Sequence, residues 1–149
     1  TRGAPMVDQA VLMRKAAEVR RYVGSVRARL RDVETAAPSE EVRDLVAFHL
    51  LLAAQAAIDL ATHFIADRGL AVPGSYRDAF HSLARAGLID DALAERLADC
   101  AAVRNRIAHV YDSLDWRRLV TEAPAHLDAL DAFLVAVAAG SADPSSSSP

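Results

Sequence analysis

The sequence of 149 residues has a single cysteine, few aromatic side chains and no segment typical of a signal peptide. Because Cys100 has no second cysteine to pair with, a small domain held together by internal disulfides is excluded. The first five residues, Thr-Arg-Gly-Ala-Pro, contain no apolar stretch, so we expect no cleaved leader and a cytoplasmic location. Asp59, His63 and Asp67 interrupt the most apolar stretch, and we therefore expect no membrane-spanning helix and no membrane partner.

Size and composition predict one domain with a substantial core. Hydrophobic residues make up 52% of the chain and charged residues 25%, and chains of about 150 residues bury about 68–70% of their unfolded surface. We place this domain at residues 6–139. Residues 140–149 are Gly, Ser, Ala, Asp and Pro only, and we expect them to form a disordered tail.

The charge of the chain is nearly balanced but unevenly distributed. A net charge of −3 argues against a general coat protein for nucleic acid. The segment 14–31 nevertheless contains seven basic residues against Glu18 alone. This segment is a solvated helix face, a surface for a phosphate backbone, or a docking site for an acidic partner.

Helical spacing of apolar residues runs through most of the chain, and no convincing strand pattern accompanies it. The first helix is predicted from an apolar seam with alternating steps of four and three residues: Leu12, Ala16, Val19, Val23, Val26, Leu30 and Val33. Pro38-Ser39 interrupts the helical pattern, and Ser39 is suited to cap the N-terminus of a second helix. Residues 42–65 are apolar almost all round, so this second helix should be the most deeply buried.

Capping residues and glycines delimit three further helices. Ser75, with an acidic residue three positions later, opens a short helix that Gly87 closes. A fourth helix begins near Asp90, and a last one begins near Asp115, where Pro124 introduces a kink or starts a second half. The predicted fold class is all-α, a bundle of four main helices and one short helix.

The segment 104–111 carries the residues best suited to chemistry, namely the cation Arg104, the proton carrier His109 and the phenol Tyr111. On a regular helix Arg104 and Tyr111 share a face to within about 20°, so the Tyr111 hydroxyl should open onto the cleft beside Arg104. Arg104 and His109 diverge by about 140°. For both to reach one phosphate, the helix must end or bend near His109, or the site must be shared between subunits. Residues 111–115 look like such a helix end.

The pattern Arg104-x-x-x-x-His109-x-Tyr111 resembles the signature of HEPN-domain toxins of the HepT-like family. Asn105 matches the polar residue that typically follows the arginine. The similarity extends over most of residues 8–137, and its further matches are Gln55 to His63, Gly69 to Pro73, Ser75-Tyr76, Phe80, Leu83 and Gly87 to Ile89.

This resemblance implies a dimeric HEPN-type bundle that acts as a metal-independent endoribonuclease toxin and needs no cofactor. Family members are homodimers whose two motifs meet across the subunit interface. They are usually paired with a minimal nucleotidyltransferase antitoxin. The antitoxin is expected to silence the toxin by attaching AMP to the tyrosine of the motif, which here is Tyr111.

The chemistry of RNA agrees with this assignment, because RNA carries its own nucleophile in the 2′-hydroxyl group. A histidine such as His109 can take the 2′-proton or protonate the leaving 5′-oxygen, and the expected product is a 2′,3′-cyclic phosphate. The fork of Arg104 can hold the phosphoryl oxygens, and the amide of Asn105 can orient the phosphate or the imidazole. Arg106 adds a phosphate contact or is an ordinary salt-bridged arginine.

Gln55, Asp59 and His63 form a polar line with a spacing of four residues on an otherwise apolar helix. This line either orders Arg104 and His109 or forms a hydrogen-bonded seam inside the bundle or dimer. Arg104 itself has a plainer interpretation, as a partner of an acid such as Asp59. Asp59 and His63 lack a third ligand, so we expect no metal site.

Two other functions remain open on the sequence alone. One is a non-catalytic HEPN module that binds nucleotide or RNA, or that scaffolds a nucleotidyltransferase. The other is a plain helical dimerisation domain in which the basic segment 14–31 docks an acidic partner.

Overall fold

The computed structural model describes residues 4–33 and 38–142, which contain helices and no strand. The elements are α1 (Ala4–Val33), α2 (Glu40–Asp67), α3 (Tyr76–Arg85), α4 (Asp91–His109), the 3₁₀ turn η1 (Tyr111–Ser113) and α5 (Trp116–Ala142). The predicted all-α bundle of four long helices and one short helix is confirmed.

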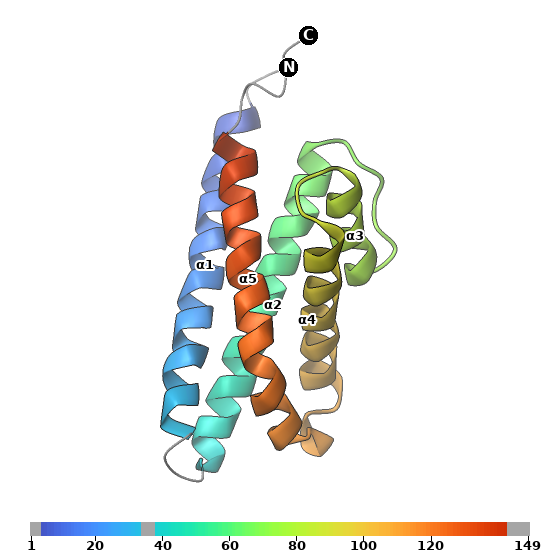
Figure 1. The fold of residues 1–149 in the computed structure, drawn as a ribbon. Helices are drawn as coiled ribbons and strands as arrows, with labels where there is room; N and C mark the ends of the chain where they lie inside the picture. Colours follow the sequence, from blue (N-terminus) through green and yellow to red (C-terminus); the bar gives the residue numbers. More distant parts are fainter. Residues whose placement is uncertain (1–3, 34–37, 143–149) are drawn as a thin grey trace.

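Helix α2 forms the centre of this bundle and packs against all four other α-helices. Figure 1 shows α1 and α5 side by side, with α3 and α4 on the other side of the molecule. Half of the buried side chains of α2 are alanines, which let the neighbouring helices approach closely. Its long run of apolar residues, which predicted the most buried helix, is thus explained by these contacts on most of its faces, although Phe48 is 55% exposed.

The helix boundaries follow the predicted capping residues. The Ser39 hydroxyl accepts a hydrogen bond from the backbone N–H of Val42 at 3.2 Å, and the Ser75 hydroxyl accepts one from Asp78 at 3.1 Å. Each bond satisfies an N–H that has no partner inside its helix. Gly87, with φ of +84°, adopts the left-handed conformation that ends α3 as expected.

The predicted seam of α1 faces the core. Val19, Val23 and Val26 are fully or almost fully buried, and Leu12 is also buried. Because these residues alternate in steps of four and three, they line one narrow stripe, which lies mainly against α2.

Helix α5 is longer than expected and continuous. Pro124 lies inside it, so the helix does not begin anew there. The helix runs through Ala142, three residues beyond the predicted end of the domain at 139. Gly140 lies against Leu88, and a Cβ atom at this position would come within 2.5 Å of Leu88 Cδ1. The remainder of the expected tail, 143–149, lies outside the described residues.

The hydropathy of two helices corrects one part of the sequence analysis. By length and composition alone, Glu40–Asp67 and Trp116–Ser141 are each apolar enough to cross a membrane. The polar interruptions at Asp59 and His63 therefore do not rule out such a helix by hydropathy. Inside the bundle, 56% and 44% of the residues in their most apolar windows are buried, so packing in a helical core also accounts for this composition.

Candidate active site

Helix α4 ends at His109, where the sequence predicts a helix end, and this end positions the motif. The N–H of Val110 donates to the carbonyl of Arg106 at 3.0 Å, and the chain then turns into η1. Arg104 and His109 both lie on the regular part of α4. The divergence of about 140° between them therefore remains within one subunit.

The Arg104 side chain is half-buried and held by neutral groups. Its Nε donates to Gln55 Oε1 at 2.8 Å, and its Nη1 donates to Asn105 Oδ1 at 3.1 Å. The guanidinium carbon also lies 5.7 Å from the centre of the Tyr76 ring. None of these three partners carries a negative charge, so they orient the guanidinium without neutralising it.

A chain of polar contacts continues from Gln55 across the bundle. Gln55 Nε2 donates to Asp59 Oδ1 at 2.9 Å, and Asp59 Oδ2 lies 3.4 Å from Nζ of Lys15 on α1. Both interpretations of the polar line find contacts here, because Gln55 holds Arg104 while Gln55, Asp59 and Lys15 form a polar seam inside the bundle. His63 lies two turns beyond Gln55 on α2 and is half-buried.

His109 is exposed at the last position of α4. Within the described part of the chain, its ring has no hydrogen-bond or ion-pair partner. Asn105 is also exposed and contacts Arg104 as stated above. The imidazole is therefore open to a substrate or to a second subunit.

The prediction that the Tyr111 hydroxyl opens onto the cleft beside Arg104 is wrong. Its Oη donates a hydrogen bond to the Asp44 carboxylate on α2. The two side chains contribute to a pocket of about 280 Å³, lined by Glu40, Arg43, Asp44, Ala47, Tyr111, Asp112, Leu114 and Trp116. Arg104 does not contribute to this pocket, because α4 ends before Tyr111 and η1 turns the ring toward the start of α2.

The environment of Tyr111 keeps its hydroxyl protonated. Desolvation, the hydrogen bond to Asp44 and the negative charges of Asp44 and Glu40 raise the pKa of the Tyr111 phenol to about 12. The residue as a whole is nevertheless 43% exposed, so Tyr111 lies at the surface.

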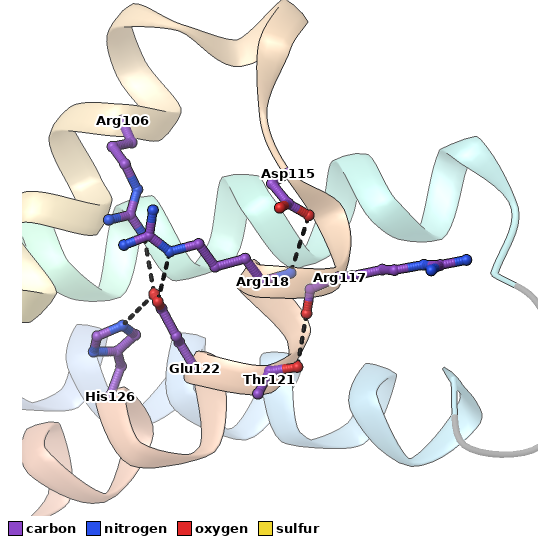
Figure 2. A network of polar contacts seen from close by, with 7 residues as sticks. All are labelled: Arg106, Asp115, Arg117, Arg118, Thr121, Glu122 and His126. Carbon is purple, nitrogen blue, oxygen red and sulfur yellow. Dashed lines mark hydrogen bonds and ion pairs between the residues drawn. The ribbon is translucent and has the colours of Figure 1, made fainter.

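Arg106 faces away from this site, into a separate cluster between α4 and α5 (Figure 2). Its Nη2 lies 3.0 Å from Glu122 Oε2, and Arg118 Nε lies 2.7 Å from Glu122 Oε1. His126 borders the same carboxylate at 3.7 Å, and burial lowers the pKa of its imidazole. The structure thus does not bring Arg106 beside Arg104, and its contacts are those of a salt-bridged arginine.

No group of three or more His, Cys, Asp or Glu side chains that could hold a metal ion occurs within residues 4–33 and 38–142. Cys100 is buried, and desolvation raises the pKa of its thiol to about 12. A buried thiol of this kind is not a nucleophile at neutral pH.

Part of the basic segment 14–31 serves the fold. Arg27 bridges to Asp128 at 3.0 Å and to Asp131 at 2.6 Å, which ties α1 to α5. Arg14, Arg20, Arg29 and Arg31 are exposed. Their role in binding RNA or an acidic partner stays a prediction.

The family model described as "Ribonuclease HepT-like" matches residues 14–137, which is most of the chain. The chain belongs to the HepT-like ribonuclease family. The predicted family and its ribonuclease activity are thereby confirmed.

A curated relative of this HepT-like chain is the mRNA nuclease HepT of Shewanella oneidensis strain MR-1. The two are 27% identical over 124 residues, which cover 83% of this chain and 93% of the relative. A solved toxin–antitoxin structure with AMP-PNP aligns with a TM-score of 0.81 and 25% identity over 87% of this chain and 98% of that one. The tri-AMPylated HEPN toxin of Shewanella oneidensis, solved in complex with an MNT antitoxin, aligns with a TM-score of 0.79 and 26% identity over 87% and 97%.

Replacing Gln55 with leucine tests whether this side chain positions Arg104 for RNA cleavage. The variant keeps much of the side-chain volume and removes the acceptor 2.8 Å from Arg104 Nε. We expect initial rates of cleavage of single-stranded RNA to fall about 10- to 100-fold, because a misplaced Arg104 guanidinium no longer contacts the phosphate in the transition state. Circular dichroism should show an unchanged helical fold.

Thr62→Val is the matched control on the same helix, since the Thr62 hydroxyl donates to the Ile58 carbonyl of α2 itself, at 2.9 Å. It should cleave at the wild-type rate. Wild-type cleavage by the Gln55→Leu variant would mean that Arg104 keeps its position without Gln55.

Proposed function

We propose that this HepT-like protein is the toxin of a toxin–antitoxin pair, a metal-independent endoribonuclease that acts as a homodimer in the cytoplasm. The observation that carries the proposal is the end of α4, where an oriented Arg104 and an open His109 lie within a chain of this family. These two groups supply what RNA cleavage needs beyond the RNA itself, namely a proton carrier and a cation for the phosphate.

In the proposed reaction the 2′-oxygen of the RNA attacks the adjacent phosphorus. His109 takes the 2′-proton, the bond from phosphorus to the 5′-oxygen breaks, and a proton from water or from the protonated imidazole reaches the leaving oxygen. Arg104 binds the phosphoryl oxygens, on which negative charge grows, and Asn105 keeps the guanidinium in place. The products are a 2′,3′-cyclic phosphate and a free 5′-hydroxyl.

The divergence of Arg104 and His109 on α4 favours a site shared between subunits. One phosphate is reached by both groups if Arg104 comes from one subunit and His109 comes from the partner.

The outward face of α2 is the surface we propose for this dimer. Leu45, Phe48 and Leu52 lie on one stripe of this helix, and Phe48 is 55% exposed. The stripe continues to Gln55, which holds Arg104. A second copy packed here would bury the apolar side chains and bring the two motifs together.

We further infer that a nucleotidyltransferase silences this chain by attaching AMP to Tyr111. The Shewanella oneidensis toxin was solved in an AMPylated form with its MNT antitoxin. Tyr111 is 43% exposed and lies two residues beyond His109. AMP at this position adds bulk and at least one negative charge just beyond His109 in the chain, so it should hinder RNA from reaching His109.

RNA cleavage in excess EDTA, measured together with sedimentation, tests the proposed enzyme. We expect full cleavage with cyclic phosphate ends, and a particle of twice 16.0 kDa at micromolar concentration. Phe48→Glu places a charge in the proposed interface, so it should give a monomer with greatly reduced cleavage.

Val135→Glu is the control for the interface, because Val135 is 71% exposed and belongs to α5, not to the helix of the proposed interface. This variant should remain dimeric and active. A monomer that cleaves RNA at the wild-type rate contradicts the shared site, and cleavage abolished by EDTA contradicts the metal-independent reaction.

A further inference from the structure

The hydroxyl of Tyr111 differs from those of the other tyrosines in what it contacts. It donates to the Asp44 carboxylate, whereas the Tyr22 hydroxyl accepts a hydrogen bond from Arg21 at 2.7 Å. Among the described residues, Tyr111 is the one tyrosine whose hydroxyl meets a carboxylate.

We propose that Asp44 is the general base for the AMP transfer to Tyr111, so that the toxin itself supplies the group that activates its own modification. This inference rests on the proposed function, since it assumes that Tyr111 is the acceptor. It assigns to this chain a catalytic group that a nucleotidyltransferase would otherwise have to provide.

A base is needed because the phenol resists ionisation. With the pKa of Tyr111 raised to about 12, very little phenolate exists at neutral pH. A neutral phenol is a weak nucleophile until an adjacent base accepts its proton as the new bond forms. Asp44 already accepts that proton in a hydrogen bond, so no rearrangement is required before the reaction.

The proposed step balances with ATP as the second reactant. The Tyr111 oxygen forms a bond to the α-phosphorus, and the bond between this phosphorus and the oxygen bridging to the β-phosphorus breaks. Pyrophosphate leaves with the electron pair of that bond. The phenolic proton passes to the Asp44 carboxylate and from there to water.

Two further carboxylates line the pocket around the Tyr111 hydroxyl, those of Glu40 on α2 and Asp112 on η1. Arg43 is the cation that lines this pocket, and its guanidinium carbon lies 5.8 Å from the centre of the Trp116 ring. The open side of the 280 Å³ pocket leaves room for a phosphate to approach the phenol.

The Asp44→Asn variant tests whether Asp44 acts as a base or only as a hydrogen-bond acceptor. Its amide oxygen still accepts from the phenol, but an amide does not take up the proton. The protein is mixed with an MNT-type nucleotidyltransferase, ATP and Mg²⁺, and the AMP gained at Tyr111 is followed by intact mass and peptide mapping. We expect the variant to be modified at least about 100-fold more slowly than wild type at neutral pH.

The pH profile gives a readout that a purely structural role of Asp44 would leave unchanged. The wild-type rate should be flat from about pH 6 to 9, since a reaction in which Asp44 takes the proton does not depend on the phenolate fraction. The Asp44→Asn rate should rise about tenfold per pH unit, because the reaction then depends on the small phenolate fraction. Asp44→Glu restores a carboxylate and should recover a flat profile.

Glu40→Gln is the matched control for charge. Like Asp44→Asn, it removes one negative charge from the pocket, but it leaves the hydrogen bond between Tyr111 and Asp44 in place. It should therefore keep the wild-type rate of AMP transfer and its pH profile. Thermal melts of all variants show whether the bundle is intact.

Wild-type modification rates with a flat profile in the Asp44→Asn variant would overturn the assignment and place the base in the transferase. If the wild-type chain gains no AMP at Tyr111, the proposed regulation fails and Asp44 loses its role with it. The first result leaves the proposed regulation intact, so the two failures are distinguishable.

Discussion

Replacing His109 with alanine is expected to abolish RNA cleavage and growth inhibition while the bundle stays folded. The side chain is exposed at the end of α4, so its removal leaves no cavity in the core. Loss of a general acid or base costs about 10²–10⁴-fold in rate. Arg104→Ala should cost about 10²–10³-fold through loss of charge stabilisation at the phosphate. Cleavage assays on purified variants and growth of the expressing cells measure both effects.

His81→Ala is the control for a histidine outside the site. His81 Nε2 lies 3.0 Å from Glu95, where α3 packs against α4, and it takes no part in the proposed reaction. The variant should cleave RNA at the wild-type rate. A His109→Ala variant that still cleaves RNA would contradict the mechanism directly.

Mixing the two inactive variants tests whether the pair crosses the interface. A mixed dimer has one intact combination, the Arg104 of the His109→Ala subunit with the His109 of the Arg104→Ala subunit. Random assortment makes half of the dimers mixed, each with one of its two sites intact, so about a quarter of the activity should return. If no cleavage activity returned, either Arg104 and His109 act within one subunit, or cleavage requires both residues in both subunits.

The sequence was sufficient to predict where most helices begin and end, because the residues that determine helix ends act locally. Ser39, Ser75 and Gly87 act within one turn of their own position, and apolar spacing identifies the buried face of α1. The helix end at His109 also followed from the residues that come after it. Even the separation of Arg104 from Arg106 is local, since neighbours two apart point about 160° away from each other on a helix.

The partners in the candidate site were not predictable in this way. Gln55 is 49 positions from Arg104, and Asp44 is 67 positions from Tyr111. Which of them meet depends on how far the antiparallel α2 and α4 are shifted along each other, and hydrophobic periodicity does not fix that register. Asp44 carried no signal of its own, because an acid in the early turns of a helix is ordinary.

The Tyr111→Phe variant should stay folded and toxic, at least in part, and escape neutralisation. The substitution removes the acceptor oxygen for AMP but keeps the ring and its packing. It also removes the hydrogen bond to Asp44, which for a partly exposed pair stabilises the fold by about 0.5–1.5 kcal/mol at most. The test is co-expression with the nucleotidyltransferase, followed by intact mass and a growth assay.

Wild-type protein should gain one or more AMP units under these conditions and stop inhibiting growth, whereas the Tyr111→Phe variant should gain none and keep inhibiting it. Tyr22→Phe is the control, because its hydroxyl is held by Arg21 on α1 and the ring stays in place. If the Tyr111→Phe variant still gains AMP and is silenced, the modified residue lies elsewhere, and Tyr22 and Tyr76 are the other tyrosines of the chain. If it is inert before any modification, Tyr111 takes part in RNA cleavage, and its pocket beside Asp44 belongs to the catalytic site as well as to its regulation.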